Sequence, residues 1–210
     1  MRRTNPIIFI LIIGLSLSHN LSADTKEILN YNLCQSCHGE NLSGNLITGS
    51  PSIAGMEEWY LYRQMKNFQS GIRGVHSDDN FGQSMRLSIM SLDDSEIKTL
   101  SSFISSLDNA KLYNQIEGDL VTGEFVFQHC ISCHGEYGEG DQTISAPKLT
   151  GQNDWYIYRQ LINFQKGVRG QHPDDLYGKQ MMEMAEMFNE EMFRDVTVYI
   201  STLDAQSIKD

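Results

Sequence analysis

All four cysteines of the chain lie in two short segments of the same design. Residues 34–38 read Cys-Gln-Ser-Cys-His, and residues 130–134, ninety-six positions later, read Cys-Ile-Ser-Cys-His. Two cysteines separated by two residues and followed by histidine are the attachment signature of c-type haem. Each thiol forms a thioether bond to a vinyl group of the porphyrin, and the histidine is an axial ligand of the iron. The sequence therefore predicts two covalent haems c, held by Cys34, Cys37, His38, Cys130, Cys133 and His134.

Thiol–disulfide exchange and zinc binding are the other common uses of Cys-X-X-Cys pairs. Neither explains why a histidine directly follows each pair. Neither calls for the export signal at the start of the chain, whereas haem c is attached outside the cytoplasm. We therefore expect haem at both motifs.

The rest of the chain repeats with the same period. A shift of ninety-six residues aligns the two halves without a gap from the haem motifs to the last helix. A period of this length indicates duplication of a whole domain, because solenoid units are only 20–50 residues long. The aligned pairs include Pro51 and Pro147, Trp59-Tyr60 and Trp155-Tyr156, Arg73 and Arg169, His76 and His172, and Met85 and Met181.

These features predict four segments. The first, 1–23, has the pattern of a secretory signal: Arg2 and Arg3 are followed by an apolar run at 7–17 and the small residues Ser22-Ala23. The apolar run is shorter than the ~20 residues needed to cross a bilayer. We expect cleavage near Ala23, a periplasmic location and no membrane span in the mature chain. The other segments are an N-terminal domain at 24–108, a linker at 109–118 and a C-terminal domain at 119–210.

The chain is acidic. It has 16 basic and 27 acidic residues, for a formal net charge of −11, and loss of Arg2 and Arg3 with the signal would make it −13. This charge argues against nucleic acid as a partner, since phosphate binding needs a basic surface. It is compatible with electrostatic steering toward a basic protein.

Apolar residues recur at helical intervals, and strand signals are nearly absent. Each half should contain a first helix, a middle helix and a closing helix, so we expect an all-α fold. Asp93 or Asp94 is the expected cap of the N-terminal closing helix. The predicted helices cover 26–33, 59–69 and 94–107 in the first half, and 123–129, 155–165 and 190–203 in the second.

A second axial ligand is needed on each iron. Met85 and Met181 match under the repeat, precede the closing helices and follow glycine-containing segments that can form loops. Met90, Met182, Met184 and Met187 lack repeat partners and are expected to fill the core. His76 and His172 also recur in register, so bis-histidine ligation is the alternative. Their Gly- and Asp-rich surroundings favour a role in surface loops.

Two further pairs could act around the haem. Arg73 and Arg169 have the right chemistry to pair with haem propionates, or are surface arginines near helix ends. Pro51 and Pro147 could present carbonyl groups to the haem-ligating histidines and orient their rings, or serve only as turn residues.

With these residues in place, the chain resembles the dihaem cytochromes c4 and their single-domain class I relatives, often called c553. Each half has the haem motif, Pro-X-X-X-Gly, and then Trp-Tyr-X-Tyr-Arg-Gln-X-X-Asn-Phe-X-X-Gly-X-Arg before the methionine. The resemblance implies two all-α cytochrome c domains about a pseudo-twofold axis, with haem propionates facing each other at the interface. It also implies His38–Met85 and His134–Met181 ligation. The segment around each of His76 and His172 looks longer than in typical members, which leaves the partner surface undefined.

The resemblance implies a periplasmic electron carrier rather than an enzyme. Its partners would be redox proteins, with a membrane-bound terminal oxidase or a reductase as acceptor. The alternatives are the cytochrome subunit of a periplasmic dehydrogenase complex and a dihaem peroxidase. A peroxidase needs one open iron and hence unlike halves, whereas these halves are alike at both candidate methionines.

Overall fold

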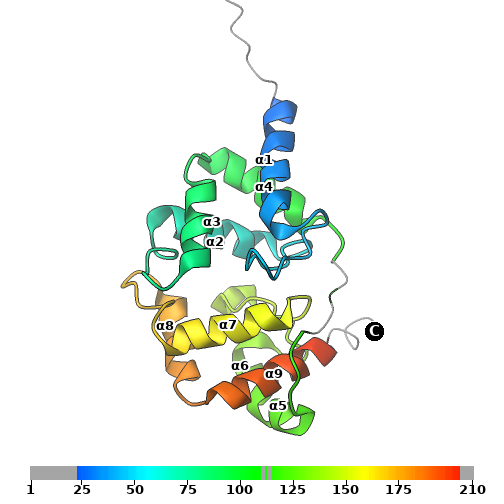
Figure 1. Cartoon of the computed structure of the whole chain (residues 1–210), viewed down its shortest axis with the longest axis vertical. Helices are drawn as coiled ribbons and strands as arrows, with labels where there is room; N and C mark the ends of the chain where they lie inside the picture. The colour runs from blue at the N-terminus through cyan, green and yellow to red at the C-terminus, as the bar shows by residue number, and fades with distance from the viewer. Residues whose placement is uncertain (1–22, 110–111, 113–114, 204–210) are drawn as a thin grey trace, which may run out of the picture.

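The structure is a computed structural model that describes residues 23–109, 112 and 115–203. Figure 1 shows two helical halves, one above the other along the long axis. The N-terminal half contains α1 (Ala23–His38), α2 (Glu58–Ser70), α3 (Asn80–Ile89) and α4 (Asp94–Ser105). The C-terminal half contains α5 (Leu120–Phe127), α6 (Ile131–His134), the short 3-10 helix η1 (Gln142–Ile144), α7 (Asp154–Gln165), α8 (Leu176–Ala185) and α9 (Glu190–Leu203).

The all-α prediction is confirmed for the described residues. Their only β pairing consists of two isolated bridges, Asn45 with Ser50 and Asp141 with Ala146, which are equivalent under the repeat. Residues 1–22 of the predicted signal sequence (1–23) and part of the predicted linker fall outside the described residues. Within the described ranges, no helix is both long and apolar enough to cross a bilayer.

The middle and closing helices lie where the sequence predicted them. Helix α2 ends at Gly71, whose left-handed φ of 80° is typical of a helix C-cap. Asp93 caps α4 in a capping box, its side chain accepting from the Glu96 backbone N–H. The first helices differ from the prediction, because α1 runs through the haem motif to His38, whereas its counterpart is divided into α5 and α6.

The expectation of loops before Met85 and Met181 is wrong. These residues lie within α3 and α8, which begin just after Asp79 and Asp175. Each aspartate caps its helix by accepting the N–H of Gly82 or Gly178 at 2.9 Å. A Cβ at either glycine would collide with that carboxylate, so the glycine makes room for the cap rather than marking a loop.

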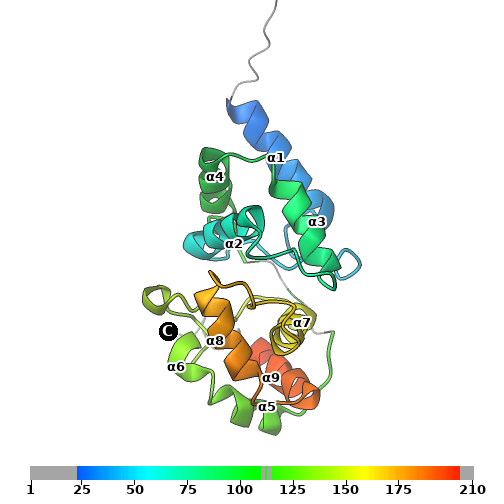
Figure 2. The same ribbon diagram turned by 90° about the vertical axis from the view of Figure 1, so that its left-hand side faces the viewer.

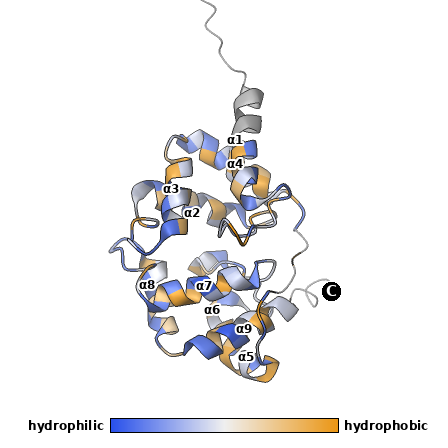
Figure 3. Cartoon of the chain, in the orientation of Figure 1, coloured by the Kyte–Doolittle hydropathy of each residue, from blue (hydrophilic) through white to orange (hydrophobic). Residues whose placement is uncertain are grey.

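Each half has its own apolar core. The N-terminal core includes Leu61, Phe68, Ile97, Leu100 and Ile104, which come from α2 and α4. The C-terminal core combines α5, α7 and α9 through Val126, Phe127, Ile157, Phe164, Phe193, Val196 and Ile200. Figure 3 shows the apolar colouring of α5, where Val121 and Phe125 remain exposed.

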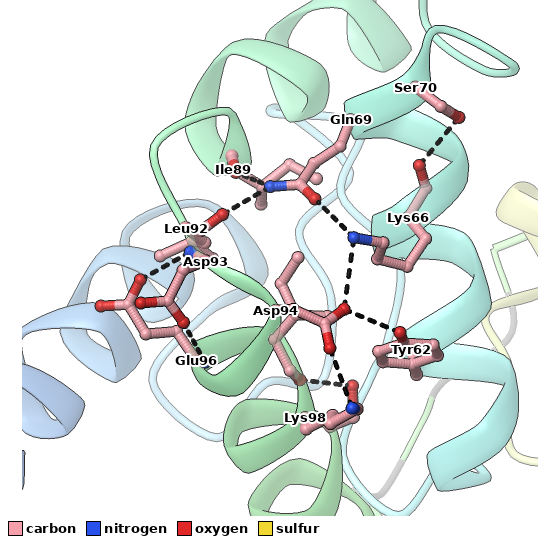
Figure 4. Close-up of polar contacts among 12 residues, drawn as sticks. Tyr62, Lys66, Gln69, Ser70, Ile89, Leu92, Asp93, Asp94, Glu96 and Lys98 are labelled. Atoms are coloured by element: carbon pink, nitrogen blue, oxygen red, sulfur yellow. Dashed lines mark hydrogen bonds and ion pairs between the residues drawn. The ribbon is translucent and has the colours of Figure 1, made fainter.

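Polar contacts join α2 to the segment that follows α3 (Figure 4). The Gln69 side-chain amide donates to the carbonyl oxygens of Ile89 and Leu92, at 3.1 and 2.7 Å. The equivalent Gln165 donates to the carbonyls of Ala185 and Phe188. The helices that carry Met85 and Met181 are thus held at both ends, by an aspartate cap and by a glutamine bridge.

The halves meet through α2 and α7, which face each other in both views (Figures 1 and 2). The contacts across this interface obey the ninety-six-residue repeat. Arg63 donates to the carbonyl of Ser145, and Arg159 donates to the carbonyl of Gly49, the position equivalent to Ser145. Arg63 lies over the Tyr177 ring and Arg159 over the Phe81 ring. The interface is therefore isologous, as in a twofold dimer.

Candidate haem sites

The two motif histidines are buried and oriented in the same way. The Nδ1 atoms of His38 and His134 each lie 2.8 Å from a carbonyl oxygen, that of Pro51 and that of Pro147. Burial lowers the pKa of both imidazoles and so favours the neutral ring. With the Nδ1–H donating to the carbonyl, the Nε2 lone pair is free to bind a metal. The carbonyl-presenting role predicted for Pro51 and Pro147 is confirmed.

The motif cysteines divide into an inner and an outer member in each half. Cys34 and Cys130 are partly buried against the core of their own half, and Cys37 and Cys133 are exposed. Burial raises the pKa of Cys34 and Cys130 to about 11. A raised pKa disfavours the thiolate, which is the form that binds metals and carries out disulfide exchange.

Each candidate methionine packs against the same apolar core as the inner cysteine of its half. Met85 and Cys34 pack against the N-terminal core, and Met181 and Cys130 pack against the C-terminal core. Met182 and Met184 also contact the C-terminal core, as expected of filler residues. Met90 and Met187, by contrast, are 51% and 59% exposed.

His76 and His172 have a local role in the loops that precede α3 and α8. The His76 Nδ1 accepts the Asp78 backbone N–H at 3.2 Å, and the His172 Nδ1 accepts that of Asp174 at the same distance. Both rings are partly exposed to solvent. This turn contact is a physical reason for the recurrence of the two histidines that does not involve a metal.

Arg73 and Arg169 lie in the interface between the halves and not on the outer surface. Arg73 donates to Gln64 at 2.5 Å and to Gln160 of the other half at 3.3 Å. Arg169 makes the equivalent contacts to Gln160 and Gln64. Each guanidinium also lies 4.5 Å from the ring centre of a phenylalanine in its own half, Phe68 or Phe164.

Arg63 and Arg159 add two more cations to this interface, and sequence reasoning missed them. Their recurrence in the shared Tyr-X-Tyr-Arg-Gln stretch is the signal that could have identified them. Burial lowers the pKa of both guanidinium groups. Burial alone would raise the pKa of Tyr156, but the nearby Arg73 and Arg169 outweigh it and lower that pKa.

No carboxylate in the described ranges forms an ion pair with these four arginines. Among the described residues, Arg63 Nη1 and the Nε atoms of Arg73 and Arg169 are buried without a hydrogen-bond partner. Buried cations normally require an anionic partner. Haem propionates are anions of the right geometry for guanidinium groups. The orphaned arginine atoms and the two oriented histidines therefore fit one haem in each half, with propionates directed toward the interface.

The comparisons with known proteins agree with this fit. The family model described as Cytochrome c matches residues 22–108 and again residues 120–204. The chain is similar to cytochrome c4 from Azotobacter vinelandii, with 24% identity over 81% of this chain and 84% of that protein. It is also similar to the thiosulfate dehydrogenase electron acceptor of Stutzerimonas stutzeri (strain A1501), with 27% identity over 69% of this chain and 68% of that protein.

The fold is similar to that of a solved dihaem structure. The structure of cytochrome c4 from Acidithiobacillus ferrooxidans matches with a TM-score of 0.68 and 25% identity. The match covers 81% of this chain and 98% of that one, so the likeness extends over both halves and their relative arrangement.

Proposed function

Because the chain belongs to the cytochrome c family and its two Cys-X-X-Cys-His motifs attach two covalent haems c, we propose that it is a periplasmic electron carrier with two closed, six-coordinate haem sites. Haem iron supplies one-electron chemistry, and the protein tunes the potential through axial ligands, hydrogen bonds and burial. The residues of this chain would hold the haem, orient the ligands of its iron and exclude water from it.

In the proposed N-terminal site, Cys34 and Cys37 would bind the haem covalently, and His38 and Met85 would ligate its iron. The C-terminal site uses Cys130, Cys133, His134 and Met181 in the same roles. Arg63, Arg73, Arg159 and Arg169 would hold the propionates. The single observation that carries the proposal is the equivalence of the two sites, in which each buried histidine is oriented by a proline carbonyl at 2.8 Å.

The equivalence of the sites favours transfer of electrons over catalysis. Met85 and Met181 occupy the same position on helices capped in the same way by Asp79 and Asp175. With both axial positions filled, neither iron offers a site at which a substrate could bind. The halves are held against each other by hydrogen bonds from Arg63, Arg73 and Arg169, and this arrangement suits transfer of an electron from one haem to the other within the molecule.

The test is a spectroscopic redox titration of the holoprotein beside Met85→Ala and Met181→Ala. Each substitution is expected to lower the potential of one haem and to halve the long-wavelength sulfur-to-iron charge-transfer band of the ferric protein. Met90→Ala and Met187→Ala are matched controls, because both side chains are largely exposed. A wild-type ferric spectrum without that band would contradict methionine ligation.

A narrower role is favoured by one comparison. A relative that covers two thirds of the chain is named as the electron acceptor of a thiosulfate dehydrogenase. We propose as the second candidate that this chain accepts electrons from a periplasmic dehydrogenase of that kind. Rapid reduction of the ferric protein by a purified thiosulfate dehydrogenase with thiosulfate would support this role. Reduction no faster than that of an unrelated c-type cytochrome would contradict it.

A further inference from the structure

Glu57 and Asn153 are equivalent residues of the twofold interface that make matching contacts but differ in charge. Glu57 and Asn153 occupy the same position in the repeat, immediately before α2 and α7. The Glu57 Oε2 accepts the backbone N–H of Lys148 at 2.9 Å, across the interface. The Asn153 Oδ1 accepts the backbone N–H of Ser52 at 2.7 Å, again across the interface. The two contacts are equivalent, but one acceptor is a carboxylate and the other a neutral amide.

Each of these contacts reaches the peptide segment that orients the histidine of the opposite half. Lys148 directly follows Pro147, whose carbonyl holds His134. Ser52 directly follows Pro51, whose carbonyl holds His38. The N-terminal half therefore places a carboxylate beside the histidine support of the C-terminal haem. In return, the C-terminal half places only a neutral group beside that of the N-terminal haem.

The Glu57 carboxylate is held in place on both oxygens. Its second oxygen, Oε1, accepts the indole N–H of Trp59 at 3.1 Å. The side chain is only partly exposed, so its field is less screened than that of a surface charge.

One opposing charge lies nearby. Lys148 stands where the N-terminal half has Ser52, and its ammonium group would act against the carboxylate. In the described part of the chain, this ammonium forms no ion pair and no hydrogen bond. A free lysine end is mobile and well hydrated, whereas the carboxylate is fixed by two donors. The carboxylate should dominate the field at the C-terminal site.

We propose that Glu57 is a potential-setting residue that acts across the interface to lower the reduction potential of the C-terminal haem, an effect for which the N-terminal haem has no counterpart. A fixed negative charge stabilises the ferric state, which carries one more positive charge than the ferrous state. The inference rests on the proposed function, since it requires a redox-active haem at each motif. The Glu57 charge alone would favour electron transfer from the C-terminal haem to the N-terminal haem.

The decisive experiment is a redox titration of holo Glu57→Gln, which removes the charge and keeps one acceptor oxygen, so that the Lys148 N–H can still be accepted as Asn153 accepts the Ser52 N–H. The two haems are followed separately by their hyperfine-shifted methyl resonances, assigned to each half by NMR. At a fixed solution potential, we expect about a threefold rise in the ferrous-to-ferric ratio of the C-terminal haem, about 28 mV by the one-electron conversion of 59 mV per tenfold. The N-terminal haem should change less.

Glu58→Gln is the matched control, because it removes the neighbouring charge from an exposed position. The reciprocal variant Asn153→Asp should lower the potential of the N-terminal haem. An unchanged C-terminal potential in Glu57→Gln, or an equal shift of both haems, would overturn the proposal. If Glu57→Gln does not fold, Asn153→Asp decides alone, and an unchanged N-terminal potential in that variant rejects the inference.

Haem content and the sulfur-to-iron band are measured on the same samples. Loss of these signals in the wild type would refute the proposed sites themselves. Intact signals together with unshifted potentials would refute only the role of Glu57.

Discussion

The aspartate cap of α8 is expected to control how firmly Met181 binds iron. Asp175 is 8% exposed, and its carboxylate accepts the Gly178 N–H at 2.9 Å at the start of the helix that carries Met181. Replacing a capping Asp by Ala costs about 0.5–2 kcal/mol. Because this cap is buried, the unpaired N–H should place the cost of Asp175→Ala in the upper half of that range, about 1–2 kcal/mol.

This cost corresponds to about a 5- to 30-fold change in an equilibrium constant. If the lost capping energy destabilises the state in which Met181 binds the iron, exogenous imidazole should displace Met181 at a correspondingly lower concentration. The assay is a titration of the ferric holoprotein with imidazole, followed by loss of the sulfur-to-iron charge-transfer band. We expect the band to disappear in two phases in Asp175→Ala, with the phase from the N-terminal haem unchanged.

Two variants separate capping from charge. Asp175→Asn keeps a good cap and removes the charge, so its titration should resemble that of the wild type. Asp174→Ala removes a neighbouring carboxylate whose side chain is 78% exposed and should also have no effect. Equal weakening in Asp175→Asn and Asp175→Ala would refute the capping mechanism and point to electrostatics at Arg63 and Arg169, whose pKa values respond to Asp175.

Three further outcomes are expected. Phe193→Ala should lower the free energy of unfolding of the C-terminal half by about 3–5 kcal/mol in denaturant titrations, because the Phe193 ring is 1% exposed. Phe125→Ala is the control and should have little effect, because the Phe125 side chain is 61% exposed. Hydrogen bonds from Lys98, Tyr62 and Lys66 lower the pKa of Asp94. The contribution of the Asp94 carboxylate to the free energy of unfolding should therefore be complete above pH ~4 and fall as the pH drops further. In denaturant titrations, the stability difference between wild type and Asp94→Asn should accordingly vanish in acid. Double replacement Cys130→Ser/Cys133→Ser should remove the C-terminal haem and, with it, half of the propionate charge expected beside the interface arginines. We therefore expect the C-terminal half to lose cooperative thermal unfolding in circular dichroism, and a sharp transition in this variant would contradict a need for haem in the folding of that half.

Much of the fold could be predicted from the chain alone. The middle and closing helices follow from apolar residues at three- and four-residue intervals, as in Ile97, Leu100 and Ile104, and these side chains are indeed in the core. Helices α3 and α8 were missed because Gly82 and Gly178 lower helix propensity. In the structure, those glycines leave room for the carboxylates of Asp79 and Asp175 that cap the helices, and this tertiary effect is not part of helix propensity.

The oriented histidines were partly predictable. Pro51 and Pro147 recur in the repeat, and a carbonyl contact to His38 and His134 was one of the two roles predicted for them, beside that of a turn residue; the structure contains this contact. The recurrence of His76 and His172 had no such explanation in sequence. Their turn contacts to Asp78 and Asp174 depend on backbone conformations that the chain adopts only when folded.

The sequence by itself determined the number of haems, the duplication and the equivalence of the two halves, because covalent attachment and helical periodicity depend on local spacing. Only the tertiary structure decided how the halves face each other. Arg63 and Arg73 lie ninety-six residues from their repeat partners Arg159 and Arg169, and the two pairs converge because the α2 side of one half faces the α7 side of the other. The same packing sets Glu57 against the support of His134, so that two nearly identical halves acquire unlike electrostatic surroundings.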